Sequence, residues 1–366
     1  MKLGIIGLPQ SGKTTIFNAL TRGDRPVGGA AYSAGGGRFE VQTAVVNVPD
    51  PRVDTLSAMF KPRKTIYAQV TYADIAGLAA EGDKGGFSGP LLGQLATMEG
   101  FLHVVRVFDN PLVPHPNLSV DAGRDLAAVE GELLLNDMLA VERKLERLRE
   151  DQRKGIVKDK GLHSQETALF GRLQEALGAG QPLRDLELSA VDEKALSSYQ
   201  LLTRKPMLVV FNVGDERPDP ASLPAYAHAR SAVAALQGKL EMEIAQLPPD
   251  EAEVFLAEYG IEEPSLNRMI RLSYDLLGLQ SFFTVGEDEV RAWTVKRGAT
   301  APEAAGEIHT DLQKGFIRAE VASYPELIEA GGYNELKARG RLRLEGKEYV
   351  VQDGDILNIR FSPPAK

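Results

Sequence analysis

The segment with the clearest chemistry is Gly7-Leu8-Pro9-Gln10-Ser11-Gly12-Lys13-Thr14, which fits the phosphate-binding pattern G-x-x-x-x-G-K-[ST]. Apolar residues at 3–6 predict a strand before it, and the apolar spacing over 13–21 predicts a helix after it. The glycines let backbone N–H groups converge on phosphate oxygens, and the helix N-terminus adds its positive dipole end. We expect Lys13 to contact the β and γ phosphates and to serve catalysis. The expected phosphate-binding residues are Pro9, Gln10, Ser11, Gly12, Lys13, Thr14 and Thr15.

Two oxygen-bearing side chains are expected to hold Mg²⁺, a small hard ion that prefers oxygen ligands and keeps several waters. One is the Thr14 hydroxyl. The other is Asp74, which follows a strand predicted over 66–73 and opens the pattern Asp74-Ile75-Ala76-Gly77. Gly77 is expected to contribute to nucleotide binding. Leu78 stands where many GTPases place a glutamine that orients the attacking water, which leucine cannot do.

A base-binding loop is expected at Asn212-Val213-Gly214-Asp215, after a strand predicted over 207–211. P-loop GTPases carry N-K-x-D at this place. Asn212 is expected either to bind the base or to tie this loop to the P-loop. Asp215 can accept hydrogen bonds from guanine N1–H and the exocyclic amine, which adenine cannot supply. Val213 lacks the lysine stem that covers the base.

The elements that must position these residues alternate between strands and helices, which predicts an α/β sheet of the P-loop NTPase type. Further strands are predicted over 41–48 and 102–108. Helix formers dominate from 121 to 205, where an apolar seam predicts a long helix in a hairpin; its members are Leu134, Met138, Val141, Leu145 and Leu148. Short strands and one helix after residue 281 predict a small β-grasp-like module. The predicted domains are therefore 1–120 with 206–280, an inserted helical arm over 121–205, and 281–366.

The composition is that of an ordinary globular protein. The chain has 366 residues, and Asp and Glu outnumber Lys and Arg by 51 to 42, for a net charge of −9. Attraction of the whole surface to nucleic acid or to an anionic membrane is therefore excluded, and any RNA contact must be a local patch. The absence of cysteine excludes thiol catalysis and cysteine-ligated metal sites. Neither a signal peptide nor a membrane-spanning run is found, so a cytoplasmic location is expected.

Two local patches of positive charge stand out. Residues 142–160 hold eight Lys or Arg against five Asp or Glu, which suits either a solvated helix face or a tip that meets a partner. Basic residues also alternate at Lys337, Arg339, Arg341 and Arg343. On a strand these four would share one face and could contact phosphates, or they could protect a solvated edge.

Taken together, the motifs resemble those of the YchF, or Obg-like ATPase, family of translation-factor-class P-loop proteins. The resemblance covers nearly the whole chain. In the N-terminal half it rests on Gly-Leu-Pro in the P-loop, the run 17–21, Pro49-Asp50-Pro51-Arg52, Asp74-Ile75-Ala76-Gly77-Leu78 and His103-Val104-Val105-Arg106. In the C-terminal part it rests on the runs 266–268, 289–294, 298–302, 307–311, 315–319 and 353–355, which are similar to the family's TGS domain. The resemblance implies a nucleotide-binding G domain, a coiled-coil arm, a TGS domain and a ribosomal partner, contacted at the large subunit and through rRNA or tRNA.

The chain departs from the family at several positions. Gln10-Ser11 replaces the Asn-Val whose asparagine is linked in related proteins to a potassium ion, and the segment 27–40 lacks the family's switch sequence, with Arg38 at the place of its threonine. The family reads its base through N-x-x-E and prefers ATP, whereas this chain has Asp215. The resemblance also implies that His103 replaces the catalytic glutamine; a strand histidine that faces the core is the alternative.

These observations predict a slow, Mg²⁺-dependent NTPase that hydrolyses ATP, with GTP as a second candidate substrate, in connection with ribosome binding and translation. ATP follows from the resemblance and GTP from Asp215. The alternative is a nucleotide-gated module that binds ribosome or RNA, prefers GTP or hydrolyses negligibly.

Overall fold

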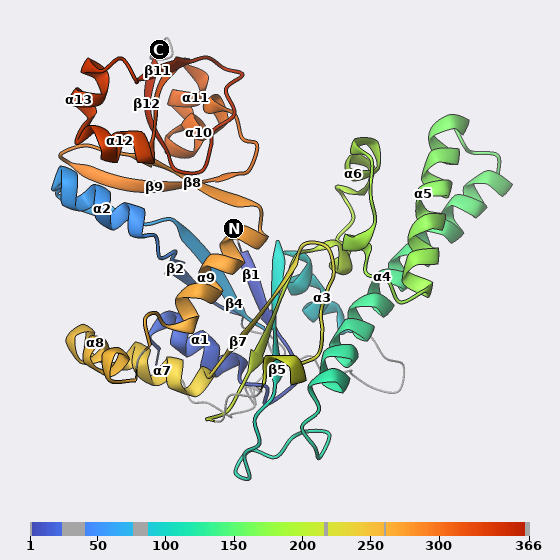
Figure 1. Ribbon diagram of the computed structural model, residues 1–366. Coiled ribbons are helices and arrows are strands. Elements are labelled where there is room, and N and C mark those ends of the chain that lie inside the picture. The colour runs from blue at the N-terminus through green and yellow to red at the C-terminus, as the bar shows by residue number, and fades with distance from the viewer. Residues whose placement is uncertain (1, 24–40, 76–86, 216–218, 260, 363–366) are drawn as a thin grey trace. The chain divides into compact units, whose positions relative to one another are not determined.

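The computed structural model describes residues 2–23, 41–75, 87–215, 219–259 and 261–362 (Figure 1). The chain divides into two compact units. The first unit comprises residues 1–44 and 71–269, and the second comprises 45–70 and 270–366. The predicted Arg38, Gly77 and Leu78 lie outside the described residues.

One of the two sheets has six strands in the order β2-β4-β1-β5-β6-β7. Its strands are β1 (Lys2–Ile6), β2 (Gln42–Asn47), β4 (Gln69–Asp74), β5 (Gly100–Arg106), β6 (Met207–Asn212) and β7 (Ser231–Leu236). The pairs β1–β4, β1–β5, β5–β6 and β6–β7 are all parallel. Near-continuous apolar runs such as Leu3–Ile6 are typical of parallel strands buried on both faces.

Helices connect these strands or follow the last of them. They are α1 (Lys13–Thr21), α3 (Gly89–Ala96), α4 (Ala122–Arg153), α5 (Lys160–Gly178), α6 (Ala190–Leu196), α7 (Gly238–Gln246), α8 (Pro249–Glu258) and α9 (Ser265–Leu276), with single 3₁₀ turns at 183–185, 202–204 and 220–222. No helix within the described residues is long and apolar enough to cross a membrane.

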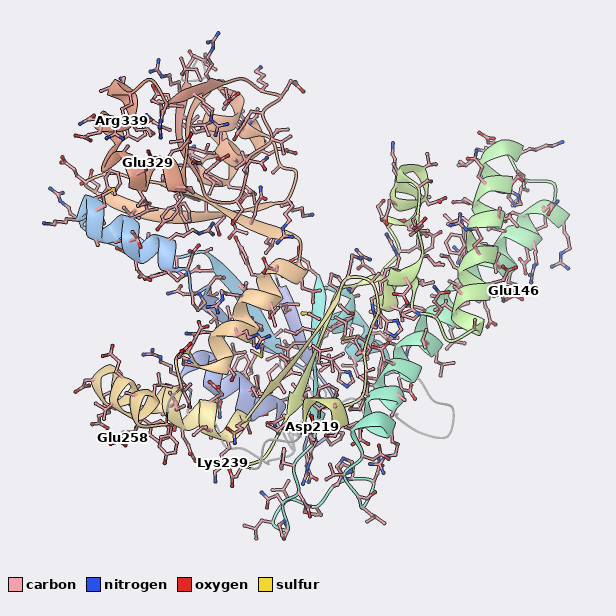
Figure 2. The ribbon with its side chains drawn as sticks, viewed as in Figure 1. Glu146, Asp219, Lys239, Glu258, Glu329 and Arg339 are labelled. Carbon is pink, nitrogen blue, oxygen red and sulfur yellow. The ribbon has the colours of Figure 1, made fainter. Side chains whose placement is uncertain are left out.

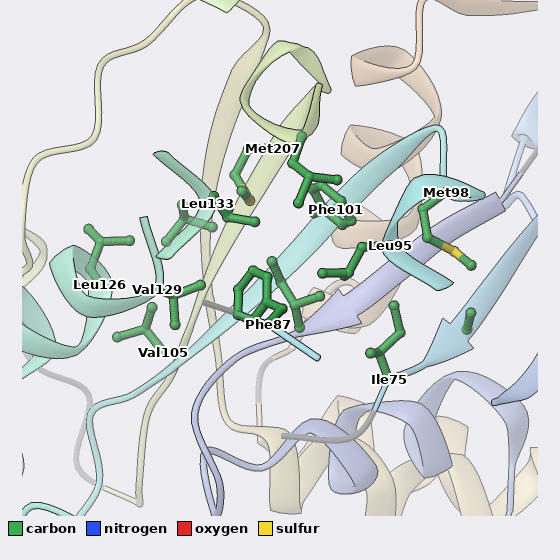
Figure 3. Close-up of a cluster of buried hydrophobic side chains, with 14 of the residues drawn as sticks. Ile75, Phe87, Leu95, Met98, Phe101, Val105, Leu126, Val129, Leu133 and Met207 are labelled. Atoms are coloured by element: carbon green, nitrogen blue, oxygen red, sulfur yellow. The ribbon is translucent and has the colours of Figure 1, made fainter. Parts of the chain in front are cut away.

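The buried cluster that supports the first sheet joins strand, helix and loop side chains (Figure 3). Phe101, Val105 and Met207 come from β5 and β6, and Leu126, Val129 and Leu133 come from the first turns of α4. The first part of α4 is therefore packed in the hydrophobic core of the first sheet, because its side chains belong to the same cluster as those of β5 and β6.

The helical arm is built as the sequence predicts. Asp121 caps α4, accepting a hydrogen bond from the backbone N–H of Arg124 at 2.9 Å. Val141 and Leu145 are buried in one cluster with side chains of α5, and Leu134 and Met138 pack against that cluster. Leu148 is buried as well. Gly155 has φ +69° between the helices, a conformation that glycine adopts without strain.

The second unit contains a mixed sheet in the order β11-β10-β12-β8-β9-β3. Its strands are β3 (Lys64–Ile66), β8 (Leu279–Thr284), β9 (Glu289–Lys296), β10 (Phe316–Ser323), β11 (Arg343–Glu345) and β12 (Asp355–Phe361). Its helices are α2 (Pro51–Phe60), α10 (Ala301–Ile308), α11 (Thr310–Lys314), α12 (Tyr324–Ala330) and α13 (Tyr333–Ala338). Strands β8 and β9 pair in antiparallel fashion.

Several features differ from the sequence expectations. The strand predicted over 66–73 is two strands, β3 and β4, in different sheets, and β7 was not predicted. Residues 45–70, placed by sequence in the first domain, join the second unit because β3 pairs with β9, a contact that local patterning cannot reveal. The prediction that four alternating basic residues share one face of a strand is wrong, because Lys337 lies in α13 and, of the four, only Arg343 lies in a strand. Asp355 and Glu345 lie 3.7 and 3.8 Å from the Arg343 guanidinium.

Candidate nucleotide-binding site

The P-loop joins β1 to α1 and takes the shape that its glycines permit. Gly7 and Gly12 have φ of +147° and +95°. A Cβ on Gly7 would lie 2.4 Å from the Val104 carbonyl oxygen, and one on Gly12 would lie 2.0 Å from Asn212 Nδ2. Neither neighbour leaves room for a side chain, so glycine is required at both positions.

Lys13 is buried at the start of α1 and donates to backbone carbonyls of its own loop. Its Nζ lies 2.8 Å from Leu8 O and 3.2 Å from Gly7 O. Burial lowers the pKa of Lys13 to about 8, and the negative charge of Asp74 opposes that shift. The ammonium is thus held inside the loop, at the place where the sequence predicts contact with phosphates.

Thr14 and Asp74 meet at the ends of α1 and β4. Thr14 Oγ1 donates to Asp74 Oδ2 at 3.3 Å, and Asp74 pairs with Ile5 of β1 in the parallel register. Within the described ranges there is no group of three or more His, Cys, Asp or Glu that could hold a metal alone. A hydroxyl and one carboxylate fit Mg²⁺, because this ion takes few protein ligands and fills its shell with water and phosphate oxygens.

Asn212 connects three loops at the carboxyl ends of the strands. Its Nδ2 donates to Ser11 O in the P-loop at 3.0 Å, and its Oδ1 accepts from the Gly238 N–H at 3.0 Å. Of the two roles expected for Asn212, the geometry is that of a tie to the P-loop. The side chain is 3% exposed, and both ends of its amide are satisfied.

The rest of the expected base loop divides into a buried and an exposed residue. Val213 belongs to the hydrophobic cluster of the first sheet, so any contact with a base falls to its backbone. Asp215 is exposed. Ser11 and Thr15 are buried, while Gln10 is exposed and has φ +62°. Pro9 is half-buried.

His103 lies in the middle of β5, between Ile6 of β1 and Val209 of β6. Only 1% of its surface is exposed. Burial, followed by the nearby charges of Lys13 and Arg184, lowers its pKa to about 3. The imidazole is therefore neutral at physiological pH and enclosed in the core.

Three residues near the site were not identified from the sequence. Arg106, buried at the end of β5, donates to Phe108 O at 3.0 Å, to Val113 O at 2.7 Å and to Gln10 O of the P-loop at 3.4 Å. Phe108 lies near both the P-loop and the expected base loop. A Cβ on Gly12 would lie 4.0 Å from the Phe108 ring, and a Cβ on Gly214 would lie 3.2 Å from Phe108 Cβ. The sequence signal for Arg106 was present, as a charge at the end of an apolar strand.

Gln237 is the third of these residues and belongs to the loop between β7 and α7. Its Nε2 donates to Gly214 O at 2.9 Å and to Asp215 O at 3.1 Å. The loop could have been found only by recognising β7, whose small residues Ala232, Ala234 and Ala235 give a weak strand signal.

Comparison with known proteins places the whole chain among relatives of one kind. It is 39% identical over 368 residues to the "Ribosome-binding ATPase YchF" of Bacillus subtilis, covering 98% of each chain. It is 34% identical over 371 residues to "Obg-like ATPase 1" of Oryza sativa, covering 99% of this chain and 92% of that protein. The solved structure of the Schizosaccharomyces pombe YchF GTPase matches with a TM-score of 0.83 and 30% identity over 98% of this chain and 97% of that one. Residues 279–362 match the family model YchF-GTPase_C, described as a protein of unknown function.

Proposed function

This chain belongs to the YchF/Obg-like ATPase family, and we propose that it is a Mg²⁺-dependent P-loop NTPase that hydrolyses ATP slowly and binds the ribosome. The observation that carries the enzymatic part is the meeting of Lys13, Thr14 and Asp74 beside a P-loop that Asn212 ties to the base loop. The printed names of the relatives, a ribosome-binding ATPase and an Obg-like ATPase, support both parts.

The chemistry assigned to these residues is mainly positioning. Lys13 exchanges its two backbone carbonyl partners for β and γ phosphate oxygens, and the P-loop N–H groups hold the remaining oxygens. Thr14 and, through water, Asp74 would hold Mg²⁺, which neutralises charge on the phosphates. We assign His103 to the core and not to proton transfer, because it is enclosed and its pKa is far below the working range. With no orienting glutamine after Gly77, turnover is slow.

Phe108 is proposed as the apolar wall of the base site. Its ring lies 4.0 Å from the place of a Cβ on Gly12, and its Cβ lies close to Gly214. It thus lies next to both the P-loop and the base loop, and it can supply the apolar surface that Val213 does not.

The helical arm is proposed to meet the ribosome through its basic tip, in the cytoplasm. The tip is the end of α4 and the start of α5, and Glu146, on the last turns of α4, is labelled in Figure 2. Arg149 and Arg153 line a surface hollow there with Glu146 and Gln152. Guanidinium groups suit RNA phosphates, and a local patch is what an acidic protein needs for such a contact.

Hydrolysis is tested with purified protein, ATP and Mg²⁺. We expect slow phosphate release that falls at least ~100-fold in Lys13→Ala and is unchanged in Lys194→Ala, an exposed lysine on α6. Equal residual rates in wild type and Lys13→Ala would favour the second candidate, a nucleotide-gated ribosome-binding module without meaningful hydrolysis. For that module the carboxylate of Asp215, which can accept hydrogen bonds from guanine, favours GTP as the ligand.

Ribosome binding is tested by co-sedimentation with large subunits over a range of salt concentrations. Replacing Arg149 and Arg153 by alanine is expected to weaken binding and to flatten its salt dependence, because fewer counterions are released. Arg172→Ala is the control, since this arginine lies nearer the base of the arm, 3.4 Å from Asp192. An unchanged salt dependence in the tip variant would remove the tip from the interface.

A further inference from the structure

We propose that Gln237 is the residue that selects the base, and that its carboxamide oxygen accepts a hydrogen bond from the 6-amino group of adenine. This inference rests on the proposed nucleotide site and adds to it the reading of the purine. It assigns adenine nucleotides as the preferred ligands through a residue outside the expected N-x-x-D loop.

The position of Gln237 follows from the order of the parallel strands. Asn212 at the end of β6 and Leu236 at the end of β7 are partners in the register, so the loops that follow them start side by side. Asn212 binds Ser11 of the P-loop on one side and Gly238 on the other. In open α/β sheets the ligand lies at this carboxyl edge of the strands, so a base attached to phosphates at the P-loop reaches these two loops.

The orientation of the Gln237 amide is set by its two hydrogen bonds. The same nitrogen faces the carbonyl oxygens of Gly214 and Asp215, at 2.9 and 3.1 Å. A flipped amide would bring its oxygen against both carbonyls, so the assignment of nitrogen and oxygen is decided by the network. Among the residues that the structure describes, none donates a hydrogen bond to the remaining Gln237 Oε1.

Gln237 is half-buried and already held at two points, so little rotamer freedom is lost when its oxygen meets a ligand. Asp215 is exposed and its side chain must be ordered when it binds. A fixed acceptor favours adenine, whose 6-position carries a donor, and disfavours guanine, whose 6-position carries an acceptor. The preorganised residue therefore decides the choice between adenine and guanine, and Asp215 does not.

The test measures binding of four Mg²⁺-nucleotides to the full chain by calorimetry: ATP, purine riboside 5′-triphosphate, which lacks the 6-amino group, ITP and GTP. Wild type is expected to bind ATP about 5- to 10-fold more tightly than purine riboside triphosphate, the effect of one hydrogen bond. In Gln237→Met, which keeps the side-chain length but removes donor and acceptor, the two affinities are expected to agree within about twofold.

The matched control is Gln246→Met, at the last residue of helix α7, which begins directly after Gln237. Gln246 Nε2 also donates to a backbone carbonyl, Gly23 O at 2.9 Å, but Gln246 is at the other end of α7. The Gln246→Met variant is expected to keep the wild-type preference for ATP over purine riboside triphosphate. Thermal unfolding of each variant checks that the fold is retained.

Several outcomes would overturn the proposal. If Gln237→Met weakened ATP and purine riboside triphosphate equally and kept their ratio, Gln237 would only hold the loop. If wild type bound GTP more tightly than ITP and ATP no more tightly than purine riboside triphosphate, Asp215 would be the reader. If wild type bound none of the four nucleotides, the proposed function itself would fail together with this inference.

Discussion

At the scale of single residues, the site contains a lysine whose charge is costly to the folded protein. Burial lowers the pKa of Lys13 to about 8, below its ordinary 10.5. Such a charge stabilises a ligand and destabilises the empty fold, which is the usual relation between activity and stability at functional sites.

The first prediction concerns Lys13→Met without nucleotide. At pH 7 the variant is expected to be more stable than wild type by up to about 3 kcal/mol, less the contribution of the two lost hydrogen bonds. Because the unfolded lysine holds its proton to a higher pH, wild-type stability rises between pH 8 and 10.5, and the advantage of the variant shrinks there. Urea unfolding at pH 7 and 10 measures both effects. A stability advantage of the variant over wild type that is smaller at pH 7 than at pH 10 would contradict this prediction.

The second prediction concerns His103, whose pKa falls to about 3 in the fold from its ordinary 6.5. Below pH 6.5 the unfolded chain takes up a proton that the folded chain refuses, so this histidine makes stability fall as pH drops. His103→Gln is expected to reduce the loss of stability between pH 7 and 4.5 by about 3 kcal/mol. Its neighbour Val209 gives the control, because Val209→Ala should lower stability equally at both values of pH.

At the scale of elements, a buried carboxylate helps to join the arm to the segment that returns from it. Asp137 of α4 is 2% exposed, and it accepts from the backbone N–H groups of Leu202 and Thr203, each at 2.7 Å. This contact anchors the 3₁₀ turn just before β6. Through it the arm is connected to the strand that ends in the base loop.

The third prediction is that Asp137→Ala destabilises the protein by about 3 kcal/mol, because two buried N–H groups lose their acceptor. In this variant, the rate of hydrogen exchange should increase more at the amides of Leu202 and Thr203 than at the amides of β6. Glu142→Ala, an exposed change on the same helix, should stay within about 0.5 kcal/mol of wild type. Protected amides at 202–203 in the alanine variant would show that another group holds the turn.

At the scale of the whole molecule, a segment from the N-terminal part of the chain completes the C-terminal unit. Arg52 of α2 lies 2.7 Å from Asp353 and 2.8 Å from Asp50, and its guanidinium lies 5.1 Å from the centre of the Phe283 ring. These contacts bring together two runs that the resemblance had singled out, 49–52 and 353–355. Burial by itself would lower the pKa of Arg52, but the hydrogen bonds that it donates to the carboxylates of Asp50 and Asp353 raise it, so Arg52 stays charged.

The fourth prediction is that Arg52→Gln loosens the second unit and leaves nucleotide affinity unchanged. The expected loss of stability is about 1 kcal/mol, since the ion pair with Asp353 is partly exposed to solvent. Limited proteolysis should cut the second unit faster in the variant, and calorimetry should give the wild-type affinity for ATP. Arg63→Gln, which alters an exposed pair with Asp288, is the control. A drop in nucleotide affinity would mean that Arg52 also acts on the first unit.

The sequence by itself determined the features that depend on neighbours along the chain. The P-loop and the apolar seam of the arm follow from residue type and spacing within a few turns, and each lies where it was expected. The family resemblance was also a property of local motifs, and the comparisons confirmed it. The placement of Thr14 near Asp74 follows once the strands are taken as parallel neighbours.

Only the tertiary structure decided what depends on partners distant in sequence. It joined residues 45–70 to the second unit through the pairing of β3 with β9, enclosed His103 between β1 and β6, and brought Gln237 against Gly214 and Asp215. The physical reason is the same in each case. Burial, pKa and hydrogen-bond partners depend on which strands lie side by side, and residue periodicity predicts a strand without naming its neighbour.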